Sequence, residues 1–118
     1  MDFDMVFTGI PVGDLHAAVL WYAALIGREP DVPVNEDEVM WQLTDSAFLY
    51  VVRDPEIAGR SVVTLSVADI DAAIAEAASR GISGGPVTAV GTAGRRAVYT
   101  DPAGNRVALV EVNQPTHG

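Results

Sequence analysis

The spacing of apolar side chains predicts two amphipathic helices. The first stripe recurs at intervals of three and four residues and consists of Leu15, Ala18, Val19, Tyr22 and Ile26. The second has the same spacing and consists of Ile70, Ala73, Ile74 and Ala77. Asp14 and Asp69 stand directly before the two stripes, where a carboxylate accepts hydrogen bonds from the free N–H groups of a first helical turn. Gly27 and Gly81 follow the stripes and predict the two helix ends.

Short apolar segments outside the helices predict strands. An apolar stretch of six or seven residues ending in V-x-D precedes each helix. The strands expected after the helices span residues 29–34, 39–43 and 47–53, and then 85–90, 95–100 and 106–112. The last two are joined by DPAGN, residues 101–105, with Pro at the second turn position and Gly where φ is positive.

The two halves of the chain are copies of one unit. FTGIPVGDLHAAVL, starting at Phe7, aligns without a gap over VVTLSVADIDAAIA, starting at Val62. Two copies are too few for a solenoid and fit a pseudo-symmetric pair. We expect one domain of class α+β, with helices on one face of largely antiparallel sheets. Its βαβββ modules span residues 1–54 and 61–112, with a linker at 55–60 and a tail at 113–118.

Composition and charge exclude several kinds of chemistry. The chain has no cysteine, which removes disulfides and thiol nucleophiles, and all seven basic residues are arginines, which removes lysine Schiff bases. The net charge is −9, of which −8 lies in residues 1–60, so nucleic acid and anionic membranes are not expected partners. The field favours cationic ligands, although acidity also serves solubility alone. No apolar run reaches the ~20 residues of a membrane span, and we expect a cytoplasmic protein.

These features resemble the vicinal oxygen chelate superfamily, which includes glyoxalases, bleomycin-resistance proteins and dioxygenases. The segments that carry the resemblance are GIPVGDLHAAVLWYAALIG, LSVADIDAAIAEAASRGI and GRRAVYTDPAGNRVALVE. Together they extend over essentially the whole chain. The resemblance implies that the two modules form a cupped mixed sheet around a cavity.

The resemblance also implies where metal ligands would stand. Metal-dependent members have a ligand at the start of the first strand of each module and a glutamate in the last strand. These positions hold Phe7, Val62 and Ala108, whose side chains cannot coordinate a metal. We therefore expect neither a metal nor a cofactor. A relocated site using His16 or Glu111 stays open as an alternative, although a surface histidine and a solvent-facing carboxylate are simpler interpretations.

An apolar cavity with a few polar groups is the usual form of a small-molecule site. The expected ligand-binding residues are five aromatic residues and one arginine: Phe7, Trp41, Phe48, Tyr50, Tyr99 and Arg95. Each aromatic residue could instead fill the core. Arg95 and Arg96 are adjacent on a strand and point to opposite faces, so one of them should face the cavity and bind a carboxylate or phosphate.

Two functional classes follow from the resemblance. One is a metal-independent homodimer that sequesters an organic ligand, such as a cationic antibiotic, in an aromatic cavity, and it has no catalytic residues. The other is a glyoxalase-like lyase, an isomerase or a dioxygenase, which would use a relocated metal or a general base. The candidates for that base are Glu111, Asp45 and Tyr99.

Overall fold

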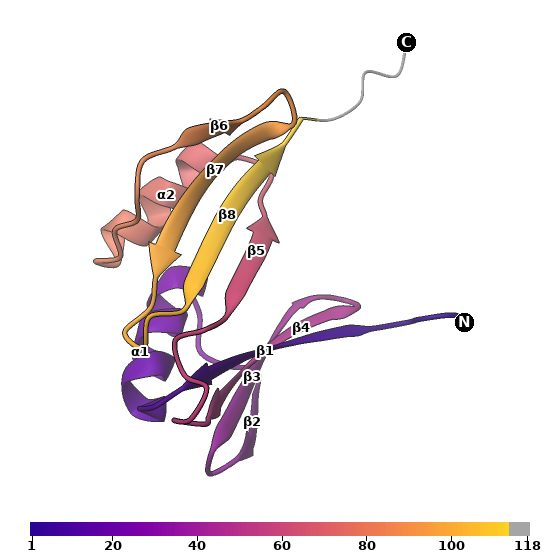
Figure 1. Ribbon diagram of the computed structural model, residues 1–118, viewed down its shortest axis with the longest axis vertical. Helices are drawn as coiled ribbons and strands as arrows, with labels where there is room; N and C mark the ends of the chain where they lie inside the picture. The colour runs from indigo at the N-terminus through magenta and orange to yellow at the C-terminus, as the bar shows by residue number, and fades with distance from the viewer. Residues whose placement is uncertain (114–118) are drawn as a thin grey trace.

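The computed structural model describes residues 1–113 and shows two βαβββ modules in succession (Figure 1). The first consists of β1 (Val6–Val12), α1 (Leu15–Ile26), β2 (Val32–Asn35), β3 (Glu38–Thr44) and β4 (Ala47–Arg53). The second consists of β5 (Val62–Ser66), α2 (Ile70–Ser79), β6 (Thr88–Val90), β7 (Gly94–Thr100) and β8 (Arg106–Val112). Most of the expected tail, including His117, lies outside the described residues.

Each module forms its own four-stranded mixed sheet. The strand orders are β1-β4-β3-β2 and β5-β8-β7-β6. β1 pairs with β4 and β5 with β8 in parallel, whereas the other pairs are antiparallel. Figure 1 shows the second sheet with α2 behind it and the first sheet lying at an angle below. The α+β class and its two βαβββ modules are confirmed, and within residues 1–113 the strands form two four-stranded mixed sheets.

The helix termini follow the predicted capping chemistry. Asp14 accepts a hydrogen bond of 3.1 Å from the Ala17 N–H, and Asp69 accepts one of the same length from the Ala72 N–H. α1 ends at Gly27, whose φ of 93° is in the left-handed region that glycine adopts readily. α2 ends at Ser79, and Arg80 is its C-cap.

The core lies on the helix side of both sheets, and side chains from the two modules form one cluster. Ile10, Trp41 and Leu49 from the first sheet are fully buried there, as is Val107 from the second. Trp41 Nε1 also donates a hydrogen bond of 2.9 Å to the Arg28 carbonyl. Successive strand residues point to opposite faces, so each sheet also has a face directed away from this cluster. Within residues 1–113 no helix of the same module lies over either of these faces. We call these the first and second open faces.

The closing turn of the second module fastens the two modules together. The Asn105 side chain donates a hydrogen bond of 2.8 Å to the Pro11 carbonyl on β1 and accepts one of 2.9 Å from the Ser61 N–H. Asp101 and Asn105 are both buried. The DPAGN motif therefore does more than reverse the chain, because it also joins the second sheet to the first strand.

Strand positions were predicted best where a run of β-prone apolar residues is bounded by turn residues. The bounds of β4 and β8 match the expected ranges, whereas β6 covers only the second half of residues 85–90 and β2 starts three residues late. The early part of each of these ranges contains proline or glycine, which weaken strand pairing. Neither helix in the described part of the chain is long and apolar enough to span a membrane.

Candidate functional site

An exposed aromatic surface lies on the first open face. Phe7 and Phe48 are register partners on β1 and β4, and their rings stack with centroids 4.8 Å apart and planes 12° apart. Phe7 remains 54 % exposed. Tyr50, two residues beyond Phe48, lies over Gly9. A Cβ atom on Gly9 would come within 2.3 Å of the tyrosine ring, so the missing side chain makes room for that ring.

Three of the six predicted ligand-binding residues thus come together, and we call Phe7, Phe48 and Tyr50 the aromatic surface. Its neighbours on β3 are Met40 and Gln42, which pair with Tyr50 and Phe48. The alternation along residues 47–53 predicts that Phe48 and Tyr50 share a face. It does not show which face is open, because both faces of β4 are apolar.

Trp41 and Tyr99 point to the opposite side of their sheets. Both are buried in the core, with exposures of 0 % and 1 %. Burial raises the pKa of Tyr99, whose hydroxyl group has no hydrogen-bond partner within residues 1–113. The structure therefore places Trp41 and Tyr99 in core packing, the alternative that the sequence left open for each aromatic residue.

Arg95 also lies on the helix side, where it supports the start of α2. Its guanidinium group forms ion pairs of 3.1 Å with Asp71 and 3.1 Å with Glu111. The hydrogen bond to Asp71 and then the one to Glu111 raise the pKa of Arg95. Arg96 points to the second open face instead, since it pairs with Val110 on β8. The structure thus places Arg95 on the helix side and Arg96 on the second open face, an assignment that a two-residue strand period cannot make by itself.

Glu111 is also not the solvent-facing carboxylate expected from the sequence. Its side chain is 25 % exposed and accepts a hydrogen bond of 3.0 Å from the Ile70 N–H at the start of α2. This carboxylate is already held by a helix N-terminus and by Arg95, so it is not free to take part in a relocated metal site. His16, the other candidate, is exposed on α1.

The positions that the family uses for metal ligands do not suit a metal here. Phe7 lies on the first open face, and Val62 and Ala108 lie on the second, as their strand registers require. None of the three side chains carries a nitrogen, oxygen or sulfur atom. In the described residues, no group of three or more histidine, aspartate or glutamate side chains is placed to hold an ion.

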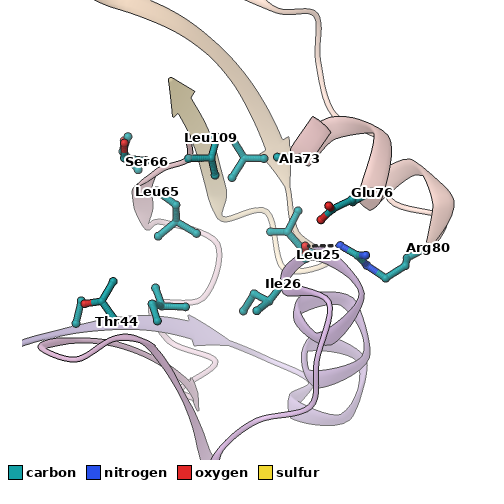
Figure 2. Close-up of a pocket in the computed structure, with 13 residues that line it drawn as sticks. Leu25, Ile26, Thr44, Leu65, Ser66, Ala73, Glu76, Arg80 and Leu109 are labelled. Atoms are coloured by element: carbon teal, nitrogen blue, oxygen red, sulfur yellow. Dashed lines mark hydrogen bonds between the residues drawn. The ribbon is translucent and has the colours of Figure 1, made fainter. Parts of the chain in front are cut away.

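A groove of about 480 Å³ opens between the two modules (Figure 2). Its apolar wall comes from both modules and includes Leu25, Ile26, Leu43, Leu65, Ala73 and Leu109. Glu76 and Arg80 of α2 lie along it, and the Arg80 guanidinium group donates to the carbonyl groups of Ala24 and Leu25 at the end of α1. We call this the inter-module groove. No local pattern in the sequence predicts this groove, because its residues are separated along the chain and its apolar residues resemble ordinary core residues.

Comparison with known proteins agrees with this architecture. Residues 4–109 match the family model described as Glyoxalase/Bleomycin resistance protein/Dioxygenase superfamily. No curated protein matches the chain. The solved structure of a glyoxalase/bleomycin resistance protein from Catenulispora acidiphila is 38 % identical, with a TM-score of 0.87, over 92 % of this chain and 98 % of that one.

Two further solved structures are similar in fold. The bleomycin-binding protein of Streptomyces verticillus, complexed with copper(II)-bleomycin, is 24 % identical over 96 % of this chain and 99 % of that one, with a TM-score of 0.76. The bleomycin resistance determinant encoded on transposon Tn5 is 19 % identical over 95 % and 100 %, with a TM-score of 0.77. The match over nearly the whole chain shows that this protein belongs to the Glyoxalase/Bleomycin resistance protein/Dioxygenase superfamily.

Proposed function

We propose that this protein is a metal-independent small-molecule-binding protein of the bleomycin-resistance type. The observation that carries the proposal is the aromatic surface. Stacked Phe7 and Phe48, with Tyr50 beside them, present flat apolar rings on a face that no helix of the module covers. Exposed aromatic side chains gathered at one place are typical of ligand-binding surfaces. Similar structures with bound bleomycin support the same use of this fold.

The ligand that suits this surface is a flat organic cation. Aromatic rings attract cations to their faces, because the ring quadrupole is negative there. The module that carries the aromatic surface holds −8 of the net charge of −9, and Glu38 lies on the same face, paired with Val52 at the far end of β4. Electrostatic attraction and stacking therefore favour the same class of molecule.

A homodimer would complete the site. Among the described residues no segment covers either open face, and Phe7 and Val62 are 54 % and 69 % exposed. A symmetric partner that placed its second open face against the aromatic surface would bury these apolar side chains and enclose the ligand. Sedimentation at micromolar concentration tests this step, and a monomer would count against it.

The enzyme alternative depends on three candidates for a general base, and none of them is well placed for that role. Glu111 is held by Arg95 and the start of α2, and burial keeps Tyr99 protonated by raising its pKa. Asp45 lies in the exposed turn between β3 and β4. Asp45 belongs to the first module, whereas Tyr99 and Glu111 lie on neighbouring strands of the second, where Tyr99 is opposite Val107 and not Glu111.

The first test combines metal analysis with calorimetry. Protein stripped with a chelator and reloaded with zinc, nickel, manganese or ferrous ion should retain no more metal than background. The stripped protein should still bind metal-free bleomycin or the flat cation proflavine. Calorimetry is preferable to tryptophan fluorescence, since Trp41 faces the core. One tightly held ion per chain, or ligand binding that needs the ion, would overturn the proposal.

The aromatic surface is tested by a matched pair of variants. Phe7→Ala should weaken proflavine binding by about tenfold, the effect of removing one stacking partner. Leu20→Ala is the control, because Leu20 is similarly exposed, at 60 %, but lies on α1. Equal affinities in the two variants would place the ligand elsewhere.

A further inference from the structure

The inter-module groove has the form of a second small-molecule site, separate from the aromatic surface. Its volume of about 480 Å³ lies within the ~300–1,000 Å³ usual for such sites. The groove is lined from the helix side by Leu25, Leu65 and Leu109, whereas the aromatic surface lies on the first open face. Figure 2 shows these leucine side chains around the space between the end of α1 and β5. An aliphatic body would fit this wall, which has no aromatic side chain.

The two charged side chains along the groove, Arg80 and Glu76, differ in whether they are available to a ligand. Arg80 is occupied, because its guanidinium group donates hydrogen bonds to the Ala24 and Leu25 carbonyl groups at the negative end of the α1 dipole. Glu76, one turn earlier on α2, has no ion-pair partner within residues 1–113. Figure 2 shows its carboxyl group directed toward the groove. The groove therefore presents an apolar wall and one available carboxylate.

We propose that the inter-module groove binds an aliphatic or alicyclic amine, with the ammonium group on Glu76 and the hydrocarbon body against Leu25, Leu65 and Leu109. The ammonium group would replace part of its hydration with the carboxylate, and the hydrocarbon would leave water for the leucine wall. The net charge of −9 raises the local concentration of such a cation. Since both modules contribute to the wall, the bound amine would hold them in one relative arrangement.

Two rigid probes of similar shape distinguish the contribution of the charge to binding from that of the hydrocarbon. Titration calorimetry should show that 1-adamantylamine binds about fivefold more tightly than 1-adamantanol, as expected for one ion pair with the exposed residue Glu76. Glu76→Gln should abolish this difference and leave adamantanol binding unchanged. Glu56→Gln, in the exposed linker, is the control and should preserve the difference. Equal binding of the two probes by the wild-type protein, or a preference that survives Glu76→Gln, would overturn the proposal.

A second pair of variants tests the location. Ala73→Leu adds volume to the groove wall and should weaken both probes, with circular dichroism confirming that the variant is folded. Phe7→Ala changes the aromatic surface alone and should leave both affinities unchanged. Loss of binding in Phe7→Ala but not in Ala73→Leu would place the amine on the aromatic surface and refute the groove site. The proposed function would survive that result, because it is tested with flat aromatic cations.

Discussion

Tyr22 donates a hydrogen bond of 2.7 Å to Asp101, a residue 79 positions later in the chain. The phenol comes from α1 of the first module and the carboxylate from the closing turn of the second. Both groups are buried, and Asp101 Oδ2 also accepts a hydrogen bond of 2.9 Å from the Asn105 side chain. The contact thus joins the two copies of the repeat at a point where no solvent competes.

Replacing Tyr22 by Phe should destabilise the whole domain. The substitution leaves a buried carboxylate with one hydrogen bond fewer, which costs about 1–3 kcal/mol. Tyr50→Phe is the matched control, because Tyr50 lies on the first open face and its hydroxyl group makes no hydrogen bond within the described residues. Its free energy of unfolding should stay within about 0.5 kcal/mol of wild type. Equal losses in the two variants, measured by denaturant unfolding, would show that the Asp101 bond does not stabilise the domain.

Stability should fall at alkaline pH because of buried tyrosines. Burial, and then the hydrogen bond to Asp101 and the charge of that residue, raise the pKa of Tyr22 above its ordinary value of 10.0, and burial raises the pKa of Tyr99. Below pH 10 both phenols are neutral in the folded and unfolded chain, so this contribution is fully present. Above pH 10 the unfolded chain releases these protons before the folded chain does, so the free energy of unfolding decreases, by at most about 1.4 kcal/mol per pH unit for each tyrosine.

The pH dependence of unfolding can be measured in this range without interference from lysine side chains, because the chain contains no lysine. Unfolding free energies between pH 9 and pH 11 should decline less steeply in Tyr22→Phe than in wild type, because one proton is removed from the linkage. Identical slopes would mean that the Tyr22 pKa is not raised in the folded protein.

The fold was predictable because each local signal occurs twice. Asp14 and Asp69 cap helices at equivalent positions, and the 55-residue offset between them assigns the same order of elements to both modules. A strand whose position was ambiguous in one copy could therefore be assigned from the equivalent strand of the other copy. The closing DPAGN turn was recognisable by its proline and glycine, but its contact with Pro11 on β1 had no signal in the sequence.

The site was harder to predict. Alternation along a strand assigns its residues to two faces, but it does not say which face is buried and which is exposed. Phe48 and Tyr50 were correctly expected on one side of a strand, yet nothing in the sequence placed Trp41 on the other side of the sheet. The alternation also does not indicate which of Arg95 and Arg96 lies on the helix side of the sheet. The inter-module groove depends on how the modules pack, and no local property of Glu76 or Leu109 indicated it.

Gly9 should be required for the position of Tyr50. In Gly9→Ala the new methyl group would overlap the tyrosine ring, which would have to turn away from β1. The free energy of unfolding should change little because the ring is at the surface, whereas proflavine affinity should fall. Gly13→Ala is the control, since a Cβ atom there meets nothing within 4 Å. An unchanged affinity in Gly9→Ala would exclude the Tyr50 ring from the ligand contact.

Glu111 should stabilise α2 from outside the helix. Its carboxylate accepts a hydrogen bond from the Ile70 N–H, which no residue of α2 itself can satisfy, so Glu111→Ala should cost about 1 kcal/mol of unfolding free energy. Glu76→Ala is the control, because it removes a carboxylate from α2 itself that makes no ion pair within residues 1–113. It should cost less than about 0.5 kcal/mol of unfolding free energy. Hydrogen exchange provides the local measurement, because the Ile70 amide should exchange faster in Glu111→Ala alone. If Ile70 exchanges at the wild-type rate in Glu111→Ala, the carboxylate does not cap α2 in solution.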